Sequence, residues 1–322
     1  MAWREILGQD QAVSLLRLHL GSGQIANAYL LAGPDGVGKR RIALEMAKAL
    51  NCTGDAEKPC DTCSSCRQMG RGVHPDLHVL LPGGASNQIK MEDVRHLLGR
   101  VALRPFSASV QAAVIVGAER LTEEAANSLL KVLEEPPAHS RFFLTTARLS
   151  DCLPTIVSRC QLIRCRPLPS DVIVRLLADA QACTPDAAQA IARLAGGSAS
   201  RALDFADRWE AHAQTVARLA DARPAVWLEQ PVPENRQDVA QLLEGMMAWL
   251  RDVAVAAASG DTRAVAHASQ EPAVRRQAET IDLDRCVATA LELVSLRESV
   301  DQFVSPRLVA TLAREKWLNL FI

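Results

Sequence analysis

The stretch AYLLAGPDGVGKRRIAL at residues 28–44 joins an apolar run, a glycine-bearing loop and an amphipathic segment. A strand followed by GxxxxGK and a helix is the context that a phosphate-binding loop requires. Gly33, Gly36 and Gly38 would let backbone N–H groups converge on phosphate oxygens at a helix N-terminus, and Lys39 would reach the outer phosphates. The stretch therefore predicts a P-loop fold.

Strand-sized apolar runs continue this pattern to about residue 165. They are AYLLAG, LHVLLP, AAVIVG, FFLTT and CQLIRC, with helical patterns between them. Such alternation indicates βαβ units and a parallel sheet that is covered on both faces. In TEEAANSLLKVLEEPP the apolar residues recur with helical spacing, so we expect a helix that begins after an N-cap at Thr122 and ends before Pro136.

The strand pattern ends after Pro167 and Pro169, and the remainder of the chain is helical in pattern. We expect an α/β class followed by an all-α class. The predicted parts are a P-loop domain at residues 1–166, a small helical module at 167–206 that contains the turn GGSAS, and a separate helical domain at 207–322.

The amino-acid composition limits the classes of function that this chain can have. The 322 residues are 48% hydrophobic and 23% charged, with a net charge of -1, so the composition gives little support to disorder, and nucleic acid could be bound only by a local patch. The N-terminus is charged where a signal peptide is apolar, and no run of eighteen apolar residues occurs, so we expect a cytoplasmic protein without membrane contact.

The P-loop lacks the residues that hold Mg²⁺ for hydrolysis. A hydrolysing P-loop carries Ser or Thr after the lysine and an acidic residue at the end of a neighbouring strand. Here Arg40 follows the lysine, and the candidate strand ends in Val116 and Gly117, with Glu119 two residues further on. We therefore expect no ATPase activity of the isolated chain and only doubtful binding of ATP or ADP, with Glu119 as a displaced substitute in the alternative hypothesis.

Four of the nine cysteines are clustered. Cys52, Cys60, Cys63 and Cys66 give C-x7-C-x2-C-x2-C in a polar insert, which predicts one tetrahedral Cys₄ zinc site. Four sulfur ligands leave no position for water, so the zinc is expected to be structural. A redox CxxC is the competing interpretation. The other five are dispersed and are expected to be ordinary core residues: Cys152, Cys160, Cys165, Cys183 and Cys286.

The order of these motifs resembles a known family. A degenerate P-loop, a four-cysteine insert, ANSLLKVLEEPPAHSRFFLTT and then LPTIVSRC occur in that order within residues 1–206. This arrangement resembles the bacterial clamp-loader subunits of DNA polymerase III, and among them the delta prime type more than the tau/gamma type. The resemblance implies an AAA+ domain, a helical lid domain and a C-terminal helical collar that serves oligomerisation.

Departures from the family pattern favour the delta prime type. Tau/gamma subunits carry an intact P-loop and a DE pair where this chain has Arg40, Val116 and Gly117. Active subunits also offer an arginine to the nucleotide after a Gly-Ser turn, and that position falls here on Ser200, with Arg201 one place late. The resemblance then implies a non-hydrolysing stator within the DNA polymerase holoenzyme.

The resemblance also gives Arg159 a role. An arginine before a strand is, taken alone, a solvated or salt-bridged surface residue. In the family, the arginine of SRC projects into the ATP site of the neighbouring subunit, where a planar cation stabilises charge that develops during phosphoryl transfer. Arg159 is thereby implied to be catalytic in trans.

The partners that the resemblance implies are the tau/gamma and delta subunits in a hetero-pentameric ring at the replisome, and through the complex the sliding clamp and primer-template DNA. Two alternatives remain at this point. One is an active ATPase motor of the tau/gamma type, and the other is a zinc-dependent nucleic-acid-binding protein on a P-loop relic. The latter is weakened because only Lys58, Arg67 and Arg71 are cationic near the cysteines.

Overall fold

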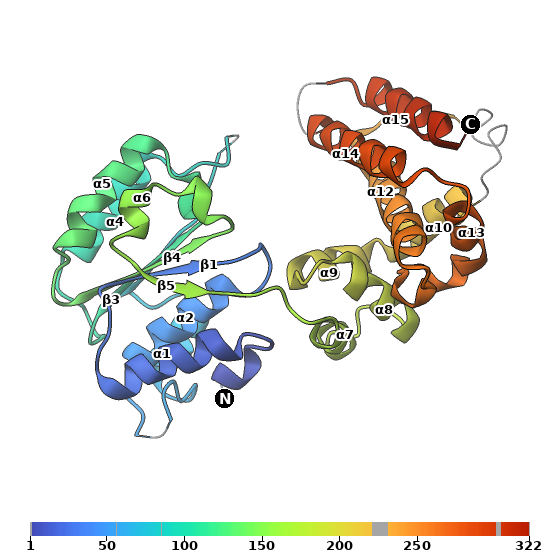
Figure 1. The fold of residues 1–322 in the computed structure, drawn as a ribbon. Helices are drawn as coiled ribbons and strands as arrows, with labels where there is room; N and C mark the ends of the chain where they lie inside the picture. Colours follow the sequence, from blue (N-terminus) through green and yellow to red (C-terminus); the bar gives the residue numbers. More distant parts are fainter. Residues whose placement is uncertain (1, 56, 85, 221–230, 301–303, 322) are drawn as a thin grey trace. The chain divides into compact units, whose positions relative to one another are not determined.

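The computed structural model of the protein describes residues 2–55, 57–84, 86–220, 231–300 and 304–321 (Figure 1). Its contacts divide the chain into two compact units. The first comprises Met1–Val172 and Gly197–Ser200, and the second comprises Ile173–Gly196 and Arg201–Ile322. The division into three domains at 166 and 206 stays a prediction.

The first unit is built on a five-stranded parallel sheet in the order β2-β3-β4-β1-β5. Each of the five predicted apolar runs forms one strand, so the α/β prediction is confirmed. The register aligns Tyr29 of β1 with Phe143 of β4 and with Gln161 of β5. The bounds are β1 Ala28–Ala32, β2 Leu77–Leu80, β3 Gln111–Val116, β4 Ser140–Thr146 and β5 Gln161–Arg164.

Helices cover both faces of this sheet because the strands are apolar on both sides. In β1, Tyr29 and Leu31 pack in one core with α1 and α2, whereas Ala28 and Leu30 pack in another with α4, α5 and α6 (Figure 1). The bounds are α1 Asp10–Ser22, α2 Lys39–Leu50, α3 Ser64–Gly70, α4 Met91–Val101, α5 Glu123–Glu134 and α6 Pro154–Val157, with 3₁₀ turns η1 Ala2–Glu5, η2 Ala118–Arg120 and η3 Leu149–Asp151.

Helix α5 begins and ends where the sequence predicts. The Thr122 hydroxyl accepts a hydrogen bond from the Ala125 N–H at 3.3 Å, which caps the first turn, and the helix ends two residues before Pro136. Because α5 connects the neighbouring parallel strands β3 and β4, it runs back against their direction. Its C-terminus therefore lies at the amino-terminal edge of the sheet.

The second unit is helical and has its own core. The longest helix, α12, contributes the fully buried Trp249, whose indole N–H donates to Gln277 Oε1 at 2.7 Å, and α15 contributes the buried Trp317. No helix in the described ranges is long and apolar enough to cross a membrane. The remaining elements of the chain are α7 Ser170–Asp179, α8 Pro185–Leu194, α9 Ala199–Asp207, α10 Trp209–Ala220, α12 Arg236–Ser259, η4 Thr262–Ala264, η5 Ala268–Gln270, α13 Glu271–Ala278, α14 Leu283–Val300 and α15 Pro306–Phe321.

Candidate functional sites

The predicted phosphate loop connects the carboxyl end of β1 to the N-terminus of α2, as the motif requires. The glycines of this loop are needed because neighbouring segments approach it closely, and also because of the backbone conformation that the loop adopts. A Cβ on Gly33 would lie 2.1 Å from the Cys165 carbonyl oxygen, and one on Gly36 would lie 2.1 Å from the hydroxyls of Ser198 and Ser200. The Ala199 N–H also donates to the Gly36 carbonyl at 2.9 Å. The tip of the loop is therefore packed against the turn at 197–200.

The side chain of Lys39 is bound within its own loop. Its ammonium donates to the carbonyls of Gly33 at 2.6 Å and Pro34 at 2.7 Å, and it approaches Asp35 Oδ1 at 3.4 Å. An ammonium has three donors, so these three oxygens occupy all of them. Lys39 is 7% exposed, and it would have to break these bonds to reach a phosphate.

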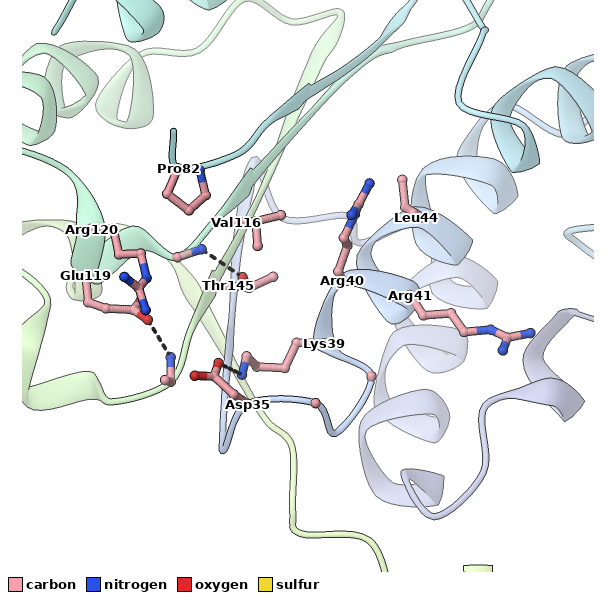
Figure 2. Close-up of a pocket in the computed structure, with 14 residues that line it drawn as sticks. Asp35, Lys39, Arg40, Arg41, Leu44, Pro82, Val116, Glu119, Arg120 and Thr145 are labelled. Atoms are coloured by element: carbon pink, nitrogen blue, oxygen red, sulfur yellow. Dashed lines mark hydrogen bonds and ion pairs between the residues drawn. The ribbon is translucent and has the colours of Figure 1, made fainter. Parts of the chain in front are cut away.

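A cavity of about 430 Å³ lies beside the loop (Figure 2). The side chain of Arg40 extends into it between Leu44 and Val116, whereas Arg41, which also lines the cavity, pairs with Glu5. Arg40 thus brings a guanidinium to the place where a hydrolysing P-loop has a hydroxyl ligand for Mg²⁺. A divalent cation would meet this positive charge.

The strand-end acid is also missing from the cavity wall. Val116 ends β3, and the Gly117 N–H donates to the Thr145 hydroxyl at 3.1 Å. Glu119 does line the cavity from η2, where one carboxylate oxygen accepts from the Ala147 N–H at 3.2 Å. Its other oxygen is buried and has no hydrogen-bond partner among the described residues. Glu119 is therefore tied to the loop after β4.

Among the residues that line this cavity and that sequence reasoning missed are Thr145, Arg120 and Pro82. All three lie at or just after the carboxyl ends of strands β4, β3 and β2. Ligands of open α/β sheets bind outside these carboxyl ends. The strand ends in the sequence were thus the signal that could have identified them.

The four clustered cysteines come together. Their Sγ atoms all lie within 4.8 Å of one another, so this group can hold a metal ion. Four sulfurs at about 2.3 Å from a tetrahedral zinc would be separated by about 3.8 Å, which this cluster can accommodate. A Cβ on Gly54 would lie 2.8 Å from the Cys60 sulfur, so this glycine leaves room for the ligand.

Backbone hydrogen bonds to sulfur prepare the cluster for a cation. The N–H groups of Cys60, Cys63 and Cys66 donate to the sulfurs of Cys52, Cys60 and Cys63 at 3.3 to 3.4 Å. The Thr62 hydroxyl, with backbone N–H groups, lowers the pKa of the Cys60 thiol to about 5, whereas burial raises the pKa of the Cys66 thiol. Stabilised thiolates favour metal ligation.

The insert is fastened to the helices around it. Lys48 of α2 donates to Asp61 at 2.5 Å and also pairs with Glu45, and the Trp3 indole donates to the Lys58 carbonyl at 2.9 Å. The Cys63 sulfur also caps α3. A metal bound by the four cysteines would therefore stabilise the N-terminal part of the first unit.

Arg159 lies far from the phosphate loop along the sheet. It occupies the turn between α6 and β5, two residues before the strand begins, and its side chain is 30% exposed. Its Nε donates to Glu134 Oε1 at 2.7 Å, and Nη1 donates to the Thr155 carbonyl at 3.0 Å. The structure brings the four metal ligands together and assembles the phosphate loop, but it keeps Arg159 apart from both.

Residues 8–169 match the family described as "DNA polymerase III, delta subunit", which is half of the chain. The chain belongs to this family. Within it, the chain is of the delta prime type and is related to tau and gamma, because delta prime subunits are among its relatives.

Three relatives illustrate the extent of the similarity. The Escherichia coli K12 DNA polymerase III subunit delta prime is 31% identical over 70% of this chain and 68% of its own length. The Pseudomonas aeruginosa delta prime subunit is 38% identical over 55% of each chain. The Salmonella typhimurium LT2 subunit tau is 36% identical over 63% of this chain. The chain spans only 32% of the length of that tau subunit.

The altered P-loop of this delta prime-type chain predicts a measurable loss of turnover. With Arg40 in place of a hydroxyl and no acid at the end of β3, the isolated chain should release phosphate from ATP at the background rate. Any weak nucleotide binding should depend little on magnesium. Phosphate release measured with magnesium and with a chelator checks both points.

The control for this prediction is a pair of variants. Lys39→Ala and Glu119→Gln should leave the release of phosphate at the same background. A steady, magnesium-dependent release that disappears in both variants would instead show that Glu119 replaces the missing acid, and the chain would be a motor subunit.

Proposed function

We propose that this chain is the delta prime subunit of a DNA polymerase III clamp loader and serves as a non-hydrolysing stator. The family match over residues 8–169 carries the proposal. The non-hydrolysing character is supported by Arg40 in the cavity and by Lys39, whose ammonium is bound by its own loop. The partners are subunits of the tau/gamma and delta types in a hetero-pentameric ring, in the cytoplasm at the replisome.

Within that ring, Arg159 acts on a nucleotide held by the neighbouring subunit. This role is supported by its partial exposure and by its distance along the sheet from the chain's own loop. A guanidinium suits it because it remains charged and binds oxygens in pairs. The sliding clamp and primer-template DNA are reached through the complex.

The metal held by the cysteine cluster is structural zinc. Four cysteine ligands close the coordination shell and leave no position for a substrate or water. When bound, zinc would supply a cross-link between Cys52, at the end of α2, and α3, and the chain's own N–H groups would stabilise the thiolates.

The helical unit contributes a collar that joins neighbouring subunits. Helix α14 carries exposed apolar residues at spacings of three and four residues, which places them on one face. Exposed apolar surface of this kind is typical of a protein-binding site. The exposed large apolar residues described on α14 and α15 are Leu283, Val287, Leu291, Val294, Leu308 and Leu312.

Reconstitution tests the proposal. The chain mixed with tau/gamma and delta subunits of the same organism should form one complex of fixed stoichiometry, and this complex should load the sliding clamp on primed DNA. The same mixture without the chain should load poorly. A full loading rate without the chain, or failure of the chain to enter the complex, would contradict the proposed function.

A further inference from the structure

An ion pair joins two sequence motifs that lie 25 residues apart. Glu134 belongs to LLKVLEEPP at the C-terminus of α5, and Arg159 belongs to SRC in the turn before β5. Both the end of α5 and the start of β5 lie at the amino-terminal edge of the parallel sheet. The fold therefore brings these motifs together at the edge opposite to the phosphate loop.

Glu134 binds one side of the Arg159 guanidinium, and Thr155 binds the other. Both Nε and Nη2 of Arg159 donate to the same oxygen, Oε1 of Glu134, and Nη1 donates to the Thr155 carbonyl at 3.0 Å. Nη1 also approaches the Ser158 hydroxyl at 3.4 Å. A guanidinium has five N–H donors in a rigid fork, so an N–H of Nη2 remains for an external oxygen.

We propose that Glu134 is a positioning residue, which holds the guanidinium of Arg159 so that the remaining N–H of Nη2 faces the neighbouring subunit's phosphates. This inference rests on the proposed trans-acting role of Arg159. A free arginine side chain samples many rotamers, and one that is bound on its Nε side loses little further freedom when it meets a phosphate. Glu134 thus acts through Arg159 and touches no substrate.

Glu134 positions Arg159 by accepting hydrogen bonds, and this role does not require its negative charge. The acceptor is one oxygen, and the amide oxygen of glutamine can accept the same two N–H groups. Glu134→Gln should therefore keep the rate close to that of the wild type. Glu134→Ala, which removes the acceptor, should lower the kcat of ATP hydrolysis at the adjacent site on the order of tenfold.

The experiment measures kcat and KM for ATP in the reconstituted complex with Glu134→Ala, Glu134→Gln, Arg159→Ala and the double variant Glu134→Ala/Arg159→Ala. Because Glu134 acts through Arg159, the double variant should hydrolyse ATP no more slowly than Arg159→Ala. The matched control is Glu135→Ala, since Glu135 is the adjacent exposed carboxylate and is not among the described hydrogen-bond partners of Arg159.

Each outcome has a distinct meaning. A loss in Glu134→Ala that Glu134→Gln restores and that disappears in the Arg159→Ala background supports the inference. An equal loss in both backgrounds means a structural role for Glu134, and a wild-type or higher rate in Glu134→Ala means that it does not position the arginine. If Arg159→Ala itself hydrolyses at the wild-type rate, the proposed function of Arg159 fails before Glu134 is considered.

Discussion

Arg159→Ala should lower ATP hydrolysis at the neighbouring subunit while leaving this chain folded, metal-loaded and able to join the complex. Arginine fingers in phosphoryl-transfer enzymes supply roughly 10³ to 10⁵ in rate, or about 4 to 7 kcal/mol at 1.36 kcal/mol per tenfold. The rate of the whole complex should fall less, because only one of its ATP sites borders this chain. Clamp loading should fall with it.

The fold should tolerate this change because the ion pair that it breaks is exposed. Arg159 and Glu134 are 30% and 48% exposed, and exposed pairs contribute at most about 1 kcal/mol. Arg159→Lys should restore little activity, since a point charge cannot reproduce a planar fork.

The control is Arg164→Ala, which removes an exposed arginine from the end of β5 and should leave the rate unchanged. ATP hydrolysis and clamp loading by the reconstituted complex are the measurements. Wild-type rates with Arg159→Ala would mean that Arg159 forms only a surface ion pair and does not act on the neighbouring subunit's nucleotide.

Purified protein should carry about one zinc per chain, and Cys63→Ser should lose most of it. One Cys₄ set holds one ion, and the apparent binding free energy of structural zinc reaches about 10 kcal/mol or more in small domains. The loss of the metal should loosen residues 52–66 first, because the four ligands that it joins lie in this segment. Metal analysis and hydrogen exchange of the full chain measure the two effects.

Hydrogen exchange of the backbone amides in β1 and β3 should change little in Cys63→Ser, because these strands are buried between the two helical layers. Cys183→Ser is the matched control, since Cys183 lies outside the cluster and should leave the zinc content unchanged. Substantially less than one equivalent of zinc in wild-type protein purified without chelators would contradict the assignment.

Local patterns made the fold predictable to a large extent. The five apolar runs became five strands, Thr122 became an N-cap, and the four cysteines converged, because each depends on residues near in sequence or on a strong ligand spacing. The broken P-loop was equally visible, since Arg40 directly follows the motif lysine.

Contacts between distant segments could not be predicted. The packing of Ser198 and Ser200 on Gly36, and the pairing of Glu134 with Arg159, depend on the strand order and on the path of the chain after β5. The bonds of Lys39 to its own loop were missed for another reason. The sequence motif leads one to expect a phosphate as the partner of its lysine. The loop carbonyls accept hydrogen bonds from the ammonium as a phosphate would, and here they lie close enough to do so.

The parallel pairing of β1 with β5 has a consequence for which residues of such chains can be substituted. The phosphate loop leaves the carboxyl end of β1, whereas Arg159 precedes the amino end of β5, so about four residues of strand, or roughly 13 Å, separate the two edges. Residues of the phosphate loop can therefore be substituted at one edge without disturbing the arginine at the other. Arg40 and Val116 can therefore differ from the residues of a hydrolysing P-loop while Arg159 keeps the role proposed for it.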